Sequence, residues 1–317
     1  MRILVAEPGY SQAALALLRT LGEVAYVPER TADIRALVAD ADVLVVRLAH
    51  RVTRDVFDAA PRLKVVATST TGLDHIDVAE AGRRGVAVLS LRGEVAFLRT
   101  VRATPEHTFA LLLALLRRIP AAAAAVHAGR WEQDPFQGRE LSGKTLGIVG
   151  IGRVGTAVAG IARGFGMRCL AYDPHLSAED ITVRGAEPVA FDALLAASDV
   201  VSMHVPLADD TVGLLSRERI ARLKSGAIVV NTARGRVIDE AALVEALASG
   251  AVAGAALDVL AAEEGSGAGT SPLVAYARDH DHVLITPHIA GTTAESLEKT
   301  QVFIAQKVID HCKKNAL

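Results

Sequence analysis

The stretch "GIVGIGRVG", residues 147–155, decides the fold of this chain. It holds the pattern Gly150-x-Gly152-x-x-Gly155 between an apolar run typical of a strand and a run with helical spacing. In such a unit the glycines allow a tight turn and a close approach of the backbone to a diphosphate, and the helix N-terminus attracts negative charge. An ordinary strand-to-helix turn is the alternative, because the glycine pattern alone is a weak signal.

Asp173 is a second indication of a dinucleotide site. It follows the next apolar run, "RCLAY", at the end of a predicted strand. An acidic side chain at this place accepts hydrogen bonds from the ribose hydroxyls of a dinucleotide, whereas it would repel a 2′-phosphate. Because no arginine follows directly in "DPHLSAED", we expect NAD rather than NADP. A capping role for Asp173 is the alternative.

In the rest of the chain, short apolar runs alternate with stretches of helical spacing in the same way. This alternation predicts parallel sheets covered by helices on both faces. The predicted strands before the glycine motif are 2–6, 24–27, 43–47, 63–68 and 86–90, and the later ones are 145–150, 168–172, 200–205, 227–231, 254–259 and 283–287. A long helix is expected to begin with Thr104 as N-cap and Pro105 as its first residue, and another covers 293–312. The sequence thus predicts an α/β protein with two doubly wound domains.

Composition excludes several classes of function. The chain has 317 residues with 51% hydrophobic and 22% charged residues and a net charge of −2, which suits a soluble protein with two cores and no broad nucleic-acid surface. The apolar stretch at 109–120 is interrupted by arginines and a proline, so we expect no membrane span. Cys169 and Cys312 have neither metal-site spacing nor a disulfide framework. We therefore expect no metal, and a reducing, cytoplasmic location.

Several longer motifs resemble one enzyme family. They are "TTGLDHID" (70–77), "ELSGKTLGIVGIGRVG" (140–155), "VVNTARGRVIDEAALVEALASGAVAGAALDV" (229–259) and "TPHIAG" (286–291). The chain is similar through these to the D-isomer-specific 2-hydroxyacid dehydrogenases, over nearly its whole length. The resemblance implies a flavodoxin-like substrate domain at 1–98 and 289–317, a Rossmann NAD domain at 99–288 and a cleft between them. It also implies a homodimer, with Trp131 at or near the interface.

The chemistry of a 2-keto acid points to three residues. Hydride transfer to its carbonyl needs a cation for the carboxylate and a proton donor for the developing alkoxide. Arg234, Glu263 and His288 lie at or just beyond the carboxyl ends of predicted strands, where open α/β sheets bind ligands. By resemblance, Arg234 holds the carboxylate, His288 is the acid in reduction and Glu263 keeps the imidazole protonated. Each residue taken alone has an alternative interpretation: a surface ion pair for Arg234, a place in a turn for His288 and a solvated side chain for Glu263.

The same resemblance implies further contacts in two groups. Cofactor contacts are expected from Thr71, Gly150, Gly152, Arg153, Val154, Gly155, Asp173, Val205, Thr232, Ala233, Asp258 and Gly291. Asp258 is expected to bind the nicotinamide carboxamide. The substrate, a 2-hydroxy or 2-keto acid, is expected to contact Arg47, Thr71, Gly72 and Arg234.

The chain also departs from the family pattern. Glu264 stands where the family usually has a proline, and the interval from Glu263 to His288 is longer than usual. Thr68 replaces an arginine expected in the phosphoglycerate dehydrogenases. The segment 92–107 is longer and carries three arginines, which either lie in a solvated loop or recognise an anionic tail. These are Arg92, Arg99 and Arg102.

Two other functions fit the same fold. One is a formate- or phosphite-type hydride donor, whose substrate lacks a 2-hydroxyl group. The other is a dinucleotide-sensing corepressor, in which cofactor binding controls partner contacts. Neither the particular acid nor the physiological direction follows from the sequence.

Overall fold

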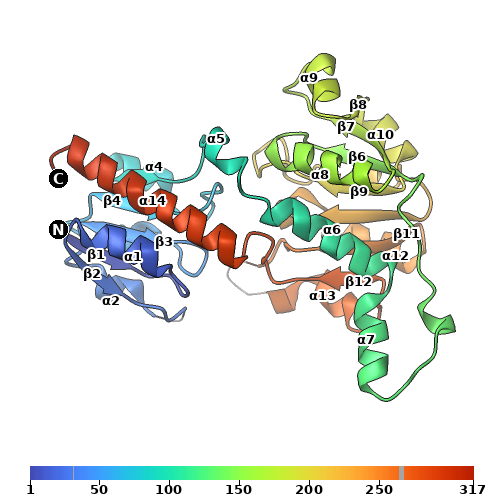
Figure 1. Cartoon of the computed structure of the whole chain (residues 1–317), viewed down its shortest axis with the longest axis horizontal. Helices are drawn as coiled ribbons and strands as arrows, with labels where there is room; N and C mark the ends of the chain where they lie inside the picture. Colours follow the sequence, from blue (N-terminus) through green and yellow to red (C-terminus); the bar gives the residue numbers. More distant parts are fainter. Residues whose placement is uncertain (31, 264–267) are drawn as a thin grey trace. The chain divides into compact units, whose positions relative to one another are not determined.

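The computed structural model describes residues 1–30, 32–263 and 268–317, and divides into two compact units. One unit comprises Met1–Val101 and Thr292–Leu317, and the other comprises Arg102–Gly291 (Figure 1). These divisions fall slightly C-terminal to the boundaries at 98/99 and 288/289 expected from the sequence. The first unit is therefore discontinuous in sequence, with the second inserted into it.

The first unit is built on a parallel sheet. In the part of the chain that the structure describes, this sheet has five strands in the order β2-β1-β3-β4-β5. A strand order that reverses beside the first strand is that of flavodoxin-like folds. The strands are β1 (Arg2–Val5), β2 (Glu23–Tyr26), β3 (Val43–Val46), β4 (Val65–Thr68) and β5 (Ala87–Leu89).

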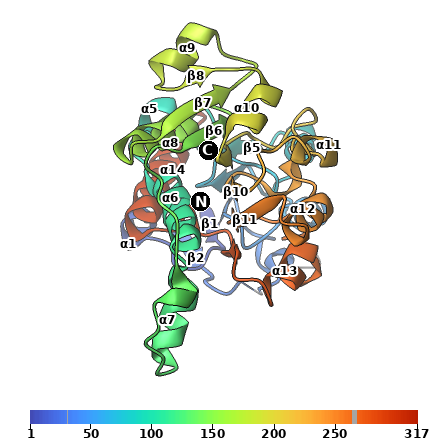
Figure 2. The same cartoon turned by 90° about the vertical axis from the view of Figure 1, so that its right-hand side faces the viewer.

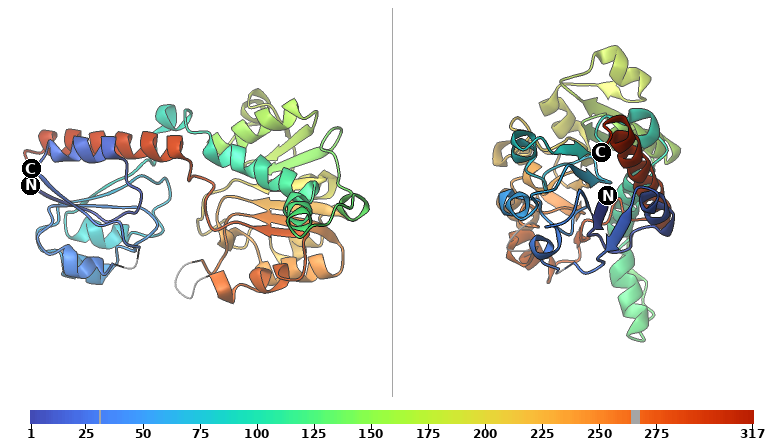
Figure 3. Two further views of the ribbon diagram at one scale, coloured as in Figure 1. Left: turned by 60° about the horizontal axis from the view of Figure 1, so that its bottom comes forward. Right: turned by 90° about the vertical axis from the view of Figure 1, so that its left-hand side faces the viewer.

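Helices cover both faces of this sheet. On one face, α1 (Gln12–Arg19) packs beside α14 (Ala294–Lys314), as the left view of Figure 3 shows. Their buried side chains join Ile3, Val5 and other alternate strand residues in one core, while the intervening strand residues face a second core. The remaining helices of this unit are α2 (Ile34–Leu37), α3 (Arg54–Asp58), α4 (Val78–Arg83) and α5 (Val95–Leu98).

The second unit has a larger parallel sheet. Within residues 102–263 and 268–291 it comprises seven strands in the order β12-β11-β10-β9-β6-β7-β8, which extends the Rossmann order at one edge. The two sheets confirm the expected fold class, and only the short edge strand β8 was missed. The strands are β6 (Thr145–Val149), β7 (Arg168–Tyr172), β8 (Glu187–Pro188), β9 (Val200–Met203), β10 (Ala227–Asn231), β11 (Val252–Leu257) and β12 (Val283–Ile285).

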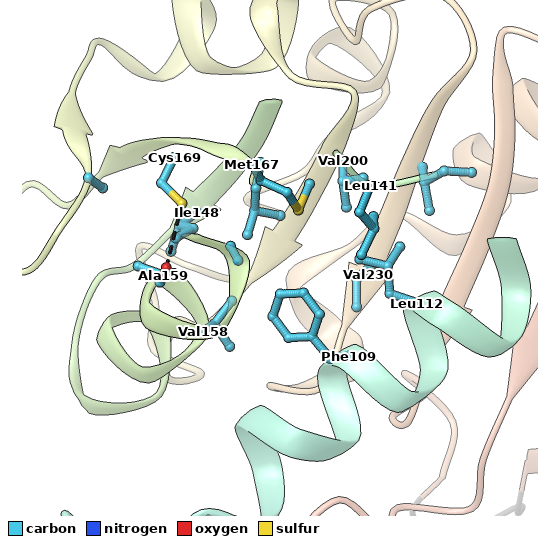
Figure 4. Close-up of a cluster of buried hydrophobic side chains, with 14 of the residues drawn as sticks. Phe109, Leu112, Leu141, Ile148, Val158, Ala159, Met167, Cys169, Val200 and Val230 are labelled. Carbon is cyan, nitrogen blue, oxygen red and sulfur yellow. Dashed lines mark hydrogen bonds between the residues drawn. The ribbon is translucent and has the colours of Figure 1, made fainter. Parts of the chain in front are cut away.

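The helices of the second unit also form two layers. Phe109 and Leu112 of α6 pack with α8 over Ile148 and Val230 of the sheet (Figure 4). On the other face, α10 and α12 enclose a separate core. The helices are α6 (Ala103–Leu116), α7 (Ile119–His127), α8 (Arg153–Gly164), α9 (Ala178–Val183), α10 (Phe191–Ala197), α11 (Arg217–Ile220), α12 (Glu240–Ala248) and α13 (Pro272–Ala277), with 3₁₀ turns η1 (Asp134–Phe136), η2 (Gly235–Val237) and η3 (Ala268–Thr270).

The start of α6 differs from the prediction. Arg102 is its N-cap, so Thr104 and Pro105 lie inside the first turn rather than at its boundary. A helix tolerates proline there because the first-turn N–H groups have no intrahelical acceptor. At its other end, Arg118 adopts a left-handed conformation with φ of +52°, and the chain then enters α7. Figure 2 shows α7 extending away from the sheet of its own unit.

Among the described residues, no single helix has both the length and the hydropathy that a bilayer crossing requires. One bent pair, Val95–Leu116 with Ile119–His127, meets these criteria jointly, with 62° between its two parts.

Candidate functional site

The glycine-rich turn after β6 has a backbone geometry that depends on its glycines. Gly150 has a φ of +87°, and a Cβ atom there would lie 2.9 Å from the carbonyl oxygen of His204. A Cβ on Gly155 would lie 2.3 Å from the carbonyl oxygen of Gly150, so only glycine lets α8 pack this closely. Gly152 is the N-cap of α8, and the space beside it is open. The turn therefore presents backbone N–H groups at a helix N-terminus with no side chain in the way.

Asp173 lies beside this turn, directly after β7. Its Oδ2 accepts a hydrogen bond from the N–H of Ile151 at 3.1 Å, and its Oδ1 accepts one from the N–H of His175 at 3.1 Å. Since a carboxylate offers about four acceptor positions, each oxygen keeps one for a ribose hydroxyl. Asp173 thus braces the turn, as the capping interpretation holds, and its contact with a ribose stays a prediction.

The structure also brings an arginine to this turn that the sequence argument missed. Arg184, at the C-cap of α9, donates from Nη1 to the carbonyl oxygen of Ile151 at 2.9 Å. The residues directly after Asp173 in the sequence include no arginine, and Arg184 instead comes from the end of the following helix. A cation therefore stands near the carboxylate that is expected to select NAD.

The other expected diphosphate and adenosine contacts surround the same turn. Arg153 and Val154 occupy the first turn of α8, and both are half-buried. Burial lowers the pKa of the Arg153 guanidinium, a cost that a bound diphosphate would offset. Val205 follows β9, and its Cγ1 would lie 2.9 Å from a Cβ on Gly150.

His288 and Glu263 form a direct pair at the carboxyl end of the sheet. Nδ1 of His288 lies 3.1 Å from Oε1 of Glu263, with the side chains 29% and 23% exposed. This geometry leaves Nε2 of the imidazole as the atom that can exchange a proton with a ligand. His288 has a φ of +54°, and its N–H donates to the carbonyl oxygens of Asp258 at 2.9 Å and Thr286 at 3.0 Å. Glu264 lies outside the described residues.

Arg234 follows β10, two strands from the strand that leads to His288. The side chain of Asn231 shapes its loop: Oδ1 accepts the N–H of Ala233 and Nδ2 donates to the carbonyl oxygen of Arg234, each at 2.9 Å. The half-buried guanidinium donates from Nη1 to the carbonyl oxygen of Ala233 at 2.7 Å. Arg234 and His288 therefore belong to the same carboxyl edge of one sheet.

Gly235 is a residue that sequence reasoning missed. A Cβ atom at this position would lie 1.9 Å from the carbonyl carbon of Leu260. The loop of Arg234 therefore packs directly on the backbone that leads to Glu263. In the sequence, the only indication of this role is that Gly235 is next to Arg234.

Glu240 is a second missed residue. This buried carboxylate on α12 accepts the N–H of Ala261 at Oε1 (2.6 Å) and the hydroxyl of Ser271 at Oε2 (2.7 Å). It thereby fixes the backbone at Ala261 and the side chain of Ser271, which lie on either side of Glu263 in the sequence. An acidic residue in the first turn of a helix is common for electrostatic reasons, so the sequence held no separate signal for it.

Asp258 and Thr232, which are both expected to lie near the nicotinamide, are buried. Burial alone would raise the pKa of Asp258, but hydrogen bonds from His107, Thr286, Ile289 and Ala290 hold it below its ordinary value. The side chain has no exposed surface, so the expected contact with the carboxamide would require its covering residues to move. Thr232 is buried, with its Oγ1 3.0 Å from that of Thr108. Gly291 ends this unit and has open space at its Cβ position.

The site residues expected from the first unit lie at the carboxyl edge of its own sheet. Arg47 follows β3, and its guanidinium lies 3.8 Å from the buried carboxylate of Glu7 and donates to the hydroxyl of Thr292 at 3.0 Å. Thr71 and Gly72 follow β4, where the hydroxyl of Thr70 donates to the carbonyl oxygen of Gly72 at 2.7 Å. Their substrate contacts stay predictions.

The departures from the family pattern have distinct environments. Thr68 is buried, and its Oγ1 lies 3.2 Å from Nε2 of His75, so a hydrogen-bonded pair of side chains occupies the place of the expected arginine. Arg92, Arg99 and Arg102 are all exposed. Their role in binding an anionic tail stays a prediction. Among the described residues, no group of three or more His, Cys, Asp or Glu side chains has the arrangement of a metal site.

Comparisons with known proteins agree with this geometry. Residues 109–290 match the family model of the D-isomer-specific 2-hydroxyacid dehydrogenase NAD-binding domain. The chain is 41% identical to D-3-phosphoglycerate dehydrogenase of Archaeoglobus fulgidus, over 99% of this chain and 58% of that protein. It is 40% identical to hydroxypyruvate reductase of Thermotoga maritima, over 87% and 86% of the two chains.

The fold is also similar to solved structures. D-lactate dehydrogenase of Aquifex aeolicus, complexed with NAD and lactic acid, aligns with a TM-score of 0.85 at 29% identity, covering 100% of this chain and 96% of that one. The chain spans about half the length of the phosphoglycerate dehydrogenases that it matches. Its length corresponds more closely to that of the hydroxypyruvate reductase.

Proposed function

Because the chain belongs to the D-isomer-specific 2-hydroxyacid dehydrogenase family, we propose that it reduces a 2-keto acid to a D-2-hydroxy acid with NADH, or catalyses the reverse oxidation. The observation that carries this proposal is the pair formed by His288 and Glu263 at 3.1 Å. It stands at the same sheet edge as the half-buried cation Arg234. A proton donor and a carboxylate-binding cation are the two groups that this reaction requires from the protein.

Each residue then has one task. NADH, when bound, supplies the hydride that reaches C2 of the keto acid. Arg234 binds the substrate carboxylate through its planar fork, which matches two carboxylate oxygens. His288 donates a proton from Nε2 to the carbonyl oxygen as it becomes an alkoxide. Glu263 accepts the Nδ1 hydrogen bond, which orients the ring and points Nε2 toward the substrate.

The cofactor site is proposed at the carboxyl edge of β6, β7 and β9. The glycine turn and Arg153 would bind the diphosphate, and Asp173 the adenosine ribose. Thr232 and Ala233 would lie near the nicotinamide. The open space at Gly152 and the two remaining acceptor positions of Asp173 support this placement.

The substrate class is tested by a panel of acids. We expect NADH oxidation with glyoxylate, hydroxypyruvate or pyruvate, measured as the loss of absorbance at the wavelength where the reduced nicotinamide ring absorbs. Formate and phosphite, tested with NAD⁺, serve as the contrast. Turnover of these donors with no turnover of any 2-keto acid would replace the proposal by the formate- or phosphite-type reaction. NADH binding without turnover of any of these substrates would instead favour the sensor function.

Cofactor choice is predicted to depend on Asp173. In the variant Asp173→Ala the repulsion of a 2′-phosphate is removed while Arg184 remains beside the turn. We expect the ratio of kcat/KM for NADH over NADPH to fall, chiefly through a lower KM for NADPH. The double variant Asp173→Ala with Arg184→Gln is the control, and it should lose the gain with NADPH. Equal use of both cofactors by the unmodified protein would contradict the role of Asp173.

A homodimer is proposed from the surface of the second unit. Three large apolar side chains are exposed on α7 and the segment after it: Ile119 at 52%, Val126 at 48% and Trp131 at 83%. Exposed apolar groups on a projecting element are typical of a surface that another chain covers. A symmetric pair, in which each copy covers the other, is the commonest solution.

Light scattering provides the test of assembly. At micromolar concentration we expect the mass of a dimer, and the variant Trp131→Glu should shift the population toward the monomer. Val183→Glu is a matched control, because Val183 is equally exposed, at 81%, but lies on α9. A monomer mass for the unmodified protein would refute the proposal.

A further inference from the structure

His107 forms a hydrogen-bonded chain to the loop that carries His288. It lies on α6, and its Nε2 is 3.0 Å from Oγ1 of Thr286 and 3.4 Å from Oδ1 of Asp258. The hydroxyl of Thr286 is in turn 2.5 Å from Oδ1 of Asp258. These contacts all lie within the unit Arg102–Gly291.

The direction of each hydrogen bond follows from chemistry. The carboxylate of Asp258 can only accept, so the hydroxyl proton of Thr286 must point to it. The lone pairs of that hydroxyl then face Nε2 of His107, which must carry a proton and donate. A neutral His107 is thereby fixed in the Nε2–H tautomer.

The carboxylate at the end of this chain holds the backbone around His288. Oδ1 of Asp258 accepts the N–H of Ile289 at 2.9 Å, and Oδ2 accepts the N–H of Ala290 at 2.7 Å. The carbonyl oxygen of Asp258 accepts the N–H of His288 itself. His288 has a left-handed backbone, which is uncommon for a non-glycine residue and persists only where its surroundings enforce it.

We propose that His107 is a positioning residue, which fixes the Asp258 carboxylate through Thr286 and so aims the imidazole of His288. This inference rests on the function proposed above. Without the donor at His107, the hydroxyl of Thr286 and Oδ1 of Asp258 lose a hydrogen-bond partner, and only the contacts with Thr286, Ile289 and Ala290 hold the carboxylate. The backbone around His288 is then held less firmly, and its ring is aimed less accurately.

The test compares two replacements of His107. His107→Gln places a donor at the same number of bonds from Cβ as Nε2, whereas His107→Leu fills the space without a donor. For reduction of the best keto acid from the panel, we expect His107→Leu to lower kcat about 10- to 100-fold, the effect of a misaimed catalytic group, with KM nearly unchanged. His107→Gln should recover most of this loss. NADH affinity, measured by fluorescence titration, should stay within about twofold in both variants.

Thr286→Val is the second variant, since it removes only the bridging hydroxyl at nearly constant volume. We expect the same loss in kcat as with His107→Leu. Unmodified kcat in His107→Leu, or equal losses with leucine and glutamine, would overturn the inference and leave the proposed function intact. If the unmodified protein reduces no keto acid of the panel, the proposed function has failed instead, and with it the premise of this inference.

Discussion

Replacing His288 by asparagine is expected to lower kcat for keto-acid reduction about 10²–10⁴-fold, the usual contribution of a positioned general acid. Asparagine tolerates the left-handed backbone found here, so the loop should keep its conformation while the proton donor is lost. NADH affinity should change little, because the proposed ribose and diphosphate contacts lie after other strands. Steady-state kinetics and fluorescence titration measure the two effects. A full kcat with His288→Asn would remove the histidine from the mechanism.

Glu263→Gln is the matched variant for the same pair. The amide keeps the shape of the side chain but removes the negative charge 3.1 Å from Nδ1 of His288. The hydrogen bond from Nδ1 then goes to a neutral acceptor, which is weaker than one to a carboxylate. The ring of His288 is oriented less firmly, so we expect kcat for keto-acid reduction to fall while KM changes little. An unchanged kcat in Glu263→Gln, together with a loss in Glu264→Gln, would transfer the role to the neighbouring glutamate.

The second large effect is expected at Arg234. Arg234→Gln should lower kcat/KM for the keto acid about 10²–10³-fold, comparable to the loss of one donor that stabilises developing charge. The reason is that the half-buried guanidinium is the cation proposed to bind the carboxylate and polarise the carbonyl. Arg234→Lys should mainly raise KM, because an ammonium group cannot form two parallel hydrogen bonds to a carboxylate.

Arg236→Gln is the control for this pair. Arg236 is exposed and two residues further along the chain, and its replacement should leave both parameters unchanged. A loss of activity in Arg236→Gln with none in Arg234→Gln would show that the carboxylate-binding arginine was chosen wrongly. Equal kcat/KM in Arg234→Gln and the unmodified protein would exclude a role for Arg234 in substrate binding.

Much of the fold could be predicted because its signals are local. Apolar runs with β-branched residues identified eleven of the strands that the structure describes, since a strand buried on both faces leaves a continuous apolar run in the sequence. The glycine turn was predictable because each glycine answers a separate steric demand, as at Gly150 and Gly155. The edge strand β8 was not predicted because two residues, one of them a proline, carry no such pattern.

The site was predictable only in part, because its support comes from distant segments. His288, Arg234 and Glu263 follow strands and could be recognised as a set. The groups that hold them could not: Gly235 matters through Leu260, Glu240 through Ala261 and Ser271, and His107 through Asp258. Such roles depend on which side chains the fold brings together. Thr104 likewise looked like an N-cap, although Arg102 holds that position.

The central claim is that a hydride passes between the nicotinamide and C2 of a D-2-hydroxy acid. It is tested most directly with NADH that carries deuterium at the transferred position of C4. The purified protein is incubated with this cofactor and with hydroxypyruvate or pyruvate, whichever it reduces faster, because the glycolate formed from glyoxylate has no D or L form. The product is analysed by mass spectrometry and chiral chromatography. We predict one deuterium at C2 and the D configuration. Unlabelled product, product of the L configuration, or no product from any keto acid would contradict the account.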